Sequence, residues 1–85
     1  MNIELRPASA SDKQRWFELW QGYLSFYETE LSVDVTKTTF ERIQKSEIHG
    51  AIVKDQEGNA LGIVHWLTHR DTWSIEDACY LEDLF

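Results

Sequence analysis

The feature that most constrains this fold is a change in the spacing of apolar residues halfway along the chain. Between residues 13 and 27, apolar residues stand at 16, 19, 20, 23, 24 and 27, which is the spacing of an amphipathic helix. After residue 48, apolar residues alternate with polar ones or form short blocks, as strands do. The sequence therefore predicts helices first and an antiparallel sheet after them.

The predicted elements are a strand at 3–8, a helix from about 11 to 27, a second helix at 36–45, and strands at 49–55, 60–69 and 78–85. Ser11 and Gln14 form a capping-box pattern at the start of the first helix, and Thr36 is the predicted cap of the second. The order is β-α-α-β-β-β. This order predicts an α+β fold in which helices cover an antiparallel meander.

Length and charge limit the classes of function. A chain of 85 residues forms one small domain. Fifteen acidic against eight basic residues give a net charge of -7, which argues against a nucleic-acid partner. The charge is compatible with cationic ligands such as amines, but solubility alone is the more common reason for such a charge.

Nothing in the sequence predicts a membrane partner or an oxidising compartment. No apolar run approaches the ~20 residues that cross a bilayer. The N-terminal residues have no signal-peptide pattern, and the single cysteine, Cys79, is expected to be a small buried residue. We expect a soluble, cytoplasmic protein.

A metal site is not expected. His65 and His69 are four residues apart, but on a strand that spacing separates them by ~13 Å. The four glycines are scattered and form no phosphate-binding loop. The chemistry must therefore come from other residues.

The last predicted strand, "ACYLEDLF" at 78–85, is unusual because two acids lie in an apolar segment. Its composition is typical of a strand covered on both faces. As the last strand it has a free edge, which predicts a larger fold or a homodimer. By strict alternation, Tyr80, Glu82 and Leu84 share one face, and the other carries Cys79, Leu81, Asp83 and Phe85.

A carboxylate in an apolar setting needs a partner, because an unpaired buried charge costs several kcal/mol. At least one of Glu82 and Asp83 is therefore expected to face a cleft or a ligand. A structural salt bridge to Arg6 or Arg70 is the alternative.

Aromatic residues and a second acidic segment add candidates. Trp16 and Trp20 are predicted core residues, whereas Trp73, in a loop, could wall a pocket or only cover strand ends. Tyr27 and Glu28 belong to "FYETE", which places acids at a helix C-terminus, where the helix dipole disfavours them. Either solvent or a cationic ligand would offset that cost.

Four segments, "IELRPASASD", "YETE", "GNALGIVHWLTH" and "WSIEDACYLEDLF", together resemble the N-terminal half of GNAT-superfamily N-acetyltransferases. The closest likeness is to the diamine (spermidine/spermine) and thialysine branch, and it extends over essentially the whole chain. The resemblance implies acetyl-CoA as the donor and a small primary amine or polyamine as the acceptor. It also implies that residues 1–85 are the N-terminal part of one GNAT-like domain.

The resemblance also implies residue roles. Glu82 matches the carboxylate that accepts the amine proton through ordered water. Asp83, Tyr27 and Glu28 match positions that line the acceptor site, and Trp73 matches an aromatic residue near that site.

The resemblance places the pyrophosphate-binding motif and the tyrosine that protonates the thiolate after Phe85. Residues 1–85 are therefore expected to supply the acceptor half and to bind acetyl-CoA poorly alone. Two alternatives remain: an inactive binding or dimerisation module that uses the edge of 78–85, or an excised piece of a full-length enzyme.

Overall fold

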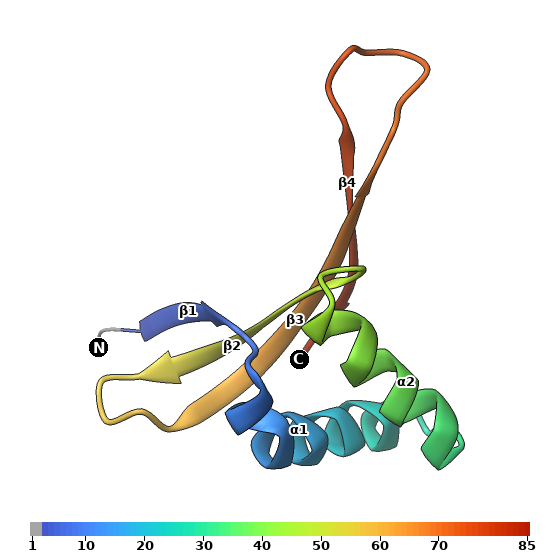
Figure 1. Ribbon diagram of the computed structural model, residues 1–85. Coiled ribbons are helices and arrows are strands. Elements are labelled where there is room, and N and C mark those ends of the chain that lie inside the picture. The colour runs from blue at the N-terminus through green and yellow to red at the C-terminus, as the bar shows by residue number, and fades with distance from the viewer. Residues whose placement is uncertain (1–2) are drawn as a thin grey trace.

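The computed structural model describes residues 3–85 as two layers, a four-stranded antiparallel sheet and a pair of helices (Figure 1). The strands are β1 (Ile3–Pro7), β2 (His49–Asp55), β3 (Ala60–His69) and β4 (Ala78–Leu84), and the helices are η1 (Ala10–Asp12), α1 (Lys13–Phe26) and α2 (Val33–Gln44). The sheet order is β1-β2-β3-β4. The predicted α+β class and the β-α-α-β-β-β order are confirmed, and the arrangement is consistent with a partial GNAT-like fold.

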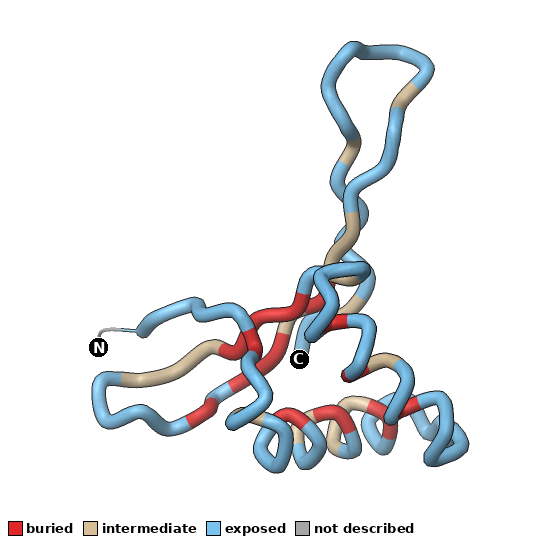
Figure 2. The backbone as a smooth tube through the Cα atoms, viewed as in Figure 1, coloured by how far each residue is buried: buried red, intermediate tan, exposed pale blue. Residues whose placement is uncertain are grey.

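The core lies between the two helices and the central strands β2 and β3 (Figure 2). Ile52 and Ile63 are fully buried there, and Trp16 is 1% exposed. Trp16 stacks on Trp20 with ring centroids 5.6 Å apart. The prediction that both tryptophans belong to the core is confirmed. The distal part of the β3–β4 hairpin extends away from this core as an exposed arm (Figure 2).

The first helix begins differently from the prediction. The backbone N–H of Ser9 donates to the Asp12 carboxylate over 2.9 Å, and residues 10–12 form the short helix η1. Asp12 is then the N-cap of α1. The predicted capping box of Ser11 and Gln14 is wrong because the carboxylate of Asp12, a stronger acceptor, pairs with Ser9.

The second helix begins three residues before the predicted start. The Ser32 hydroxyl accepts a hydrogen bond from the Val35 N–H, 3.3 Å away, and so caps α2. Thr36, the predicted cap, is instead buried and accepts a hydrogen bond from Trp20 Nε1 over 3.1 Å. The β-branched residues after Ser32 have low helix propensity, but this cap and the burial of Phe40 outweigh it.

Both helices end with a non-glycine residue in the left-handed backbone region. Glu28 follows α1 with φ 53°, and Ser46 follows α2 with φ 60°. In each case the next N–H closes the last turn: Thr29 donates to the Leu24 carbonyl, and Glu47 donates to the Arg42 carbonyl, both over 2.9 Å. These are Schellman ends, in which glycine is usually preferred.

Glu28→Gly and Ser46→Gly should therefore each raise the free energy of unfolding by about 0.5–1 kcal/mol, because glycine adopts positive φ without steric cost. Urea unfolding of the two variants and the parent measures this. The two substitutions are controls for each other, since only Glu28 is a candidate site residue. A loss of stability in either variant would contradict the strain assigned to these ends.

β4 is an edge strand, and its side chains remain largely exposed. Tyr80, Leu81 and Leu84 are 55%, 56% and 65% exposed. The expectation that 78–85 is covered on both faces is therefore not met within residues 3–85. Cys79 is also exposed rather than buried, because it lies on this uncovered strand.

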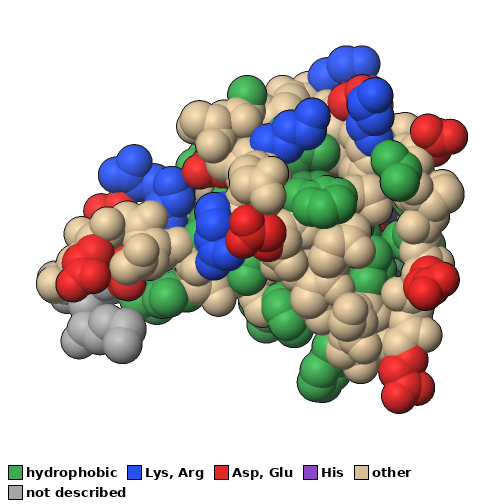
Figure 3. All heavy atoms as spheres, turned by 90° about the horizontal axis from the view of Figure 1, so that it is seen from below, with side chains coloured by type: hydrophobic (Ala, Val, Ile, Leu, Met, Phe, Trp, Pro, Cys, Tyr) green, Lys and Arg blue, Asp and Glu red, His purple; other side chains and the backbone are tan. Residues whose placement is uncertain are grey.

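The outer surface of the helix layer is mixed in character. Seen from that side, basic and acidic side chains are interspersed with exposed apolar ones (Figure 3). Phe17, Val33 and Val35 are among the exposed apolar residues of the two helices. Within residues 3–85, no helix has the length and apolar character needed to cross a membrane.

Candidate amine-acceptor site

An irregularity in the β3–β4 ladder organises the candidate site. His65 pairs with Asp83, but the next residue of β3, Trp66, pairs with Leu81. Glu82 therefore has no opposing residue and forms a β-bulge. A bulge interrupts the alternation of faces and redirects the extra side chain.

The bulge changes the predicted faces of the strand. Cross-strand partners point to the same side of a sheet, so Asp83 lies on the side of His65 and Leu81 lies on the side of Trp66. His65 and Trp66 are neighbours and point to opposite sides. The prediction that Leu81 and Asp83 share a face is thus wrong, because the bulge adds one residue between them.

Asp83 is held by a hydrogen-bonded chain that reaches the core. Its Oδ2 lies 3.0 Å from Nδ1 of His65, and Nε2 of His65 lies 2.9 Å from Nε1 of Trp16. The Asp83 side chain is 15% exposed, so it lies at the boundary between core and solvent. The predicted alternative of a salt bridge to Arg6 or Arg70 is wrong for Asp83: the structure pairs Arg6 with Glu4 and Arg70 with Asp77.

Tyr23, on α1, adjoins the same carboxylate. A hydrogen bond to Asp83, burial, and the negative charge of Asp83 raise the pKa of Tyr23 to about 12, with smaller contributions from Tyr27 and Glu82. Tyr27 lies against Tyr23, with ring centroids 5.0 Å apart, and Asp83 and Glu82 both act on the Tyr23 phenol; we call these four residues the acidic cluster. Its ionisable groups are two carboxyl groups and two phenols, none of which carries a positive charge. The cluster is therefore suited to bind a cation.

Aromatic rings border the acidic cluster. The ring of Tyr23 lies 5.0 Å from that of Tyr27 and 5.9 Å from that of Phe85, both in edge-on geometry. Phe26 lies 6.5 Å from Phe85. The C-terminal half of α1 and the end of β4 therefore border the cluster with aromatic rings, whose faces attract cations.

The raised pKa of Tyr23 predicts a distinct titration. Of the three tyrosines, one should ionise about two pH units later than a free phenol. The folded pKa lies above the unfolded value, so the stabilisation is complete below pH ~10 and is lost as the pH rises towards ~12. Absorbance titration of the parent and Tyr23→Phe measures this. Tyr80→Phe is the control, and a late component that persists in Tyr23→Phe would contradict the assignment.

The five predicted site residues do not all meet. Tyr27, Glu82 and Asp83 are brought together, and Glu28 directly follows Tyr27 at the end of α1. Trp73 is 94% exposed and belongs to the loop between β3 and β4. This loop forms the far end of the arm (Figure 1). Within a single chain, Trp73 is therefore not part of the cluster.

Sequence reasoning missed two residues of this site. In the sequence, Tyr23 is only one of the apolar positions that predict the first helix, and His65 suggests only a metal-ligand spacing with His69. Tyr23 stands four residues before Tyr27, so the two share a helix face, and this spacing was a usable signal. For His65 the sequence offers no comparable signal, because its partners lie 49 and 18 residues away.

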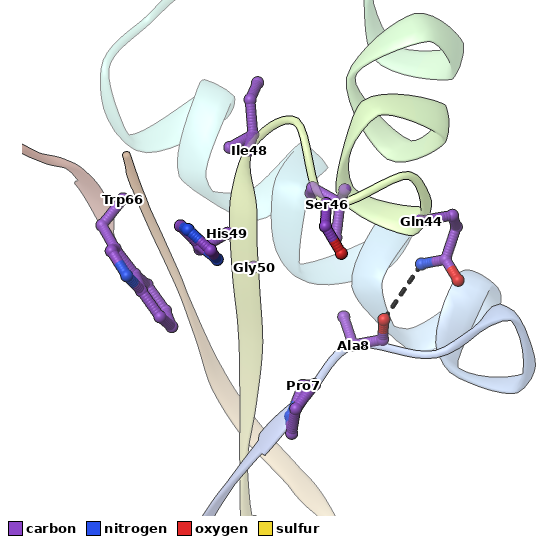
Figure 4. Close-up of a pocket in the computed structure, with 9 residues that line it drawn as sticks. Pro7, Ala8, Gln44, Ser46, Ile48, His49, Gly50 and Trp66 are labelled. Carbon is purple, nitrogen blue, oxygen red and sulfur yellow. Dashed lines mark hydrogen bonds between the residues drawn. The ribbon is translucent and has the colours of Figure 1, made fainter. Parts of the chain in front are cut away.

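A separate cavity of about 280 Å³ lies where β1, β2 and the end of α2 meet. His49 stacks against Trp66 on one side, with ring centroids 5.4 Å apart, and Gln44 donates a hydrogen bond to the Ala8 carbonyl on the other (Figure 4). None of the described residues that line it is acidic. It is therefore a poorer candidate for an amine than the acidic cluster. Residues 3–85 also contain no group of three or more His, Cys, Asp or Glu side chains that could hold a metal ion.

Comparison with known proteins finds a similar N-acetyltransferase. The chain is similar to the D-amino-acid N-acetyltransferase HPA3 of Saccharomyces cerevisiae, with 33% identity over 86 residues. The match covers 98% of this chain but 53% of the yeast protein, so the chain spans about half the length of that relative. No protein-family model matches the chain.

Proposed function

We propose that this protein is an acetyl-CoA-dependent N-acetyltransferase of the GNAT superfamily, and that residues 1–85 supply its amine-acceptor half as the N-terminal part of one domain. The observation that carries the proposal is the acidic cluster of Tyr23, Tyr27, Glu82 and Asp83 at the bulge. Similarity to a yeast N-acetyltransferase over 98% of the chain supports it.

The cluster suits the acceptor chemistry. A primary amine has a pKa of ~10 and is a cation at neutral pH. Two carboxylates bordered by aromatic rings bind such a cation by charge and by contact with its methylene groups. In this proposal Asp83 binds the ammonium group, while Tyr27 and Glu28 shape the approach to it.

Acetyl transfer requires the ammonium to lose a proton before the amine attacks. Glu82 is assigned as the group that accepts this proton through a water molecule, because the bulge turns it out of the regular ladder and leaves it exposed. The neutral amine then forms the amide C–N bond as the thioester C–S bond of acetyl-CoA breaks. The nitrogen loses its second proton, which balances the proton that the thiolate takes up.

The charge of the cluster favours a simple amine over an amino acid. The residues that act on Tyr23 there include two carboxylates, Asp83 and Glu82. The carboxylate of an amino-acid acceptor would be repelled by them unless a cationic group outside this cluster offsets it. We therefore propose a diamine or polyamine acceptor, although the yeast relative is named for D-amino acids.

Thiol release from acetyl-CoA tests both parts of the proposal. The full-length protein is assayed with 1,4-diaminobutane and with D-alanine at matched concentrations. We expect turnover with both, with kcat/KM for the diamine at least tenfold higher, a difference of ~1.4 kcal/mol. Faster turnover of D-alanine would overturn the acceptor class only, whereas no thiol release with any amine would overturn the proposed function.

The exposed edge of β4 favours a second role, self-association. β4 has one neighbour in the sheet, and Tyr80 and Leu81 on it are more than half exposed. For residues 1–85 alone, we propose a homodimer that pairs along this edge, as the alternative to an edge covered by the rest of the domain. Trp73 would reach an acceptor site only if the arm bent back or a second copy supplied it.

Sedimentation of the parent and of Leu81→Lys measures this association. A dimer that Leu81→Lys weakens would support pairing along β4. A rise in melting temperature on adding acetyl-CoA would in addition support an enzyme. A dimer that shows no such shift would favour the inactive binding module, and a monomer would exclude pairing along β4.

A further inference from the structure

A fully enclosed histidine is unexpected in so small a core. His65 is 1% exposed and is one of two buried polar residues in the described chain, with Thr36. An apolar side chain would fill the same space without the cost of burying polar nitrogens. Both ring nitrogens of His65 have partners, Trp16 on the core side and Asp83 on the site side.

The partners fix the protonation of the ring. The indole N–H of Trp16 can only donate, so Nε2 of His65 must accept. The proton therefore resides on Nδ1, which donates to Oδ2 of Asp83 over 3.0 Å. A doubly protonated ring would leave the Trp16 N–H without an acceptor.

The ring is also fixed in orientation. Trp16 and Trp20 both pack against His65, with ring centroids 5.8 and 5.4 Å from it. Because His65 is buried among aromatic rings, it cannot rotate without breaking this packing. The Nδ1–H bond therefore points at Asp83 from a rigid support on α1 and β3.

We propose that His65 is a positioning residue for the amine-acceptor site: it holds one oxygen of Asp83 and so sets the plane in which that carboxylate meets Tyr23 and the ammonium group. This inference rests on the proposed function. His65 does not touch the acceptor itself. Its effect reaches the amine only through Asp83, whose second oxygen is left for other donors.

Two substitutions separate the two hydrogen bonds of the ring. In His65→Gln, the side-chain oxygen can occupy the place of Nε2 and accept from Trp16, but nothing donates to Asp83. In His65→Asn, the shorter amide can occupy the place of Nδ1 and donate to Asp83, but the Trp16 N–H loses its acceptor. His65→Gln therefore tests the positioning of Asp83, and His65→Asn tests the contribution of the Trp16 hydrogen bond to core stability.

Amine affinity and stability are measured for the full-length protein, using 1,4-diaminobutane as the probe in calorimetry and urea for unfolding. We expect His65→Gln to raise the Kd of the diamine about tenfold, the effect of losing a hydrogen bond to a charged group. We expect His65→Asn to bind within about twofold of the parent, although it unfolds at lower urea. In the acetylation assay, the loss in His65→Gln should be in KM more than in kcat.

Nitrogen NMR of the parent gives an independent readout, since the chemical shifts of Nδ1 and Nε2 identify the protonated atom. We expect the Nδ1–H form, and a change in its shift on adding the diamine. The positioning role would be overturned if His65→Gln bound the diamine as tightly as the parent does. It would also be overturned if the Kd of each variant changed only in proportion to its loss of stability. A parent that binds no diamine and acetylates no amine would instead overturn the proposed function on which it rests.

Discussion

Replacing Glu82 by glutamine is expected to lower kcat for amine acetylation by about 10²–10³-fold, the usual contribution of a general base. Glutamine has the same shape as glutamate but cannot accept the proton that the ammonium group must lose. Glu82 is exposed on the bulge, so the substitution should change the free energy of unfolding by less than ~0.5 kcal/mol. Thiol-release kinetics and urea unfolding of the same preparation measure both quantities.

Glu76→Gln is the matched control for this prediction. Glu76 is an exposed acid in the loop of the arm, away from the acidic cluster, and its loss changes the net charge by the same amount. Its kcat should remain within about twofold of the parent, since a distant exposed charge is largely screened. If Glu82→Gln and Glu76→Gln retain the same activity, another group accepts the proton and the role given to Glu82 is wrong.

The central strands could be predicted from the sequence to the residue. β2 and β3 have the predicted bounds, 49–55 and 60–69. Their apolar pattern is local, and the segment between them holds Gly58 with φ 84°, which is a turn conformation readable from sequence. Where the determinant of structure is local and repeated over several residues, the sequence is sufficient.

The helix starts were missed because each depends on one hydrogen bond. Ser9, Ser11, Ser32 and Thr36 are all acceptable caps by type. Which one acts is decided by tertiary contacts, such as the burial of Thr36 beneath Trp20. Residue preference alone cannot rank such candidates.

The candidate site was only partly predictable for a similar reason. The acids of "YLED" and the tyrosine of "FYETE" were identified from type and position, and three of those residues do come together. The bulge at Glu82 depends on the register against β3, which strict alternation within one strand cannot reveal. The structure thus explains how an apolar strand accommodates two adjacent acids. Asp83 is hydrogen-bonded to the buried His65, and Glu82 is turned out of the ladder by the bulge.

The largest effect on stability is expected at Trp16, which supports both the core and His65. Trp16→Ala should lower the free energy of unfolding by about 3–5 kcal/mol, because it leaves a large cavity against Trp20 and Phe40. It also removes the donor to His65. A domain of this size has a total stability near the lower end of 5–15 kcal/mol, so up to about half of the variant should be unfolded at 25 °C.

The neighbouring residue gives the control. Phe17→Ala removes a ring of similar size from the same turn of α1, but Phe17 is 43% exposed. We expect Phe17→Ala to lower the free energy of unfolding by about 1 kcal/mol, because Phe17 buries less area than Trp16. Urea unfolding followed by circular dichroism measures both variants. Equal losses would mean that Trp16 is not the support of this core, and the rigid base assigned to His65 and Asp83 would fail with it.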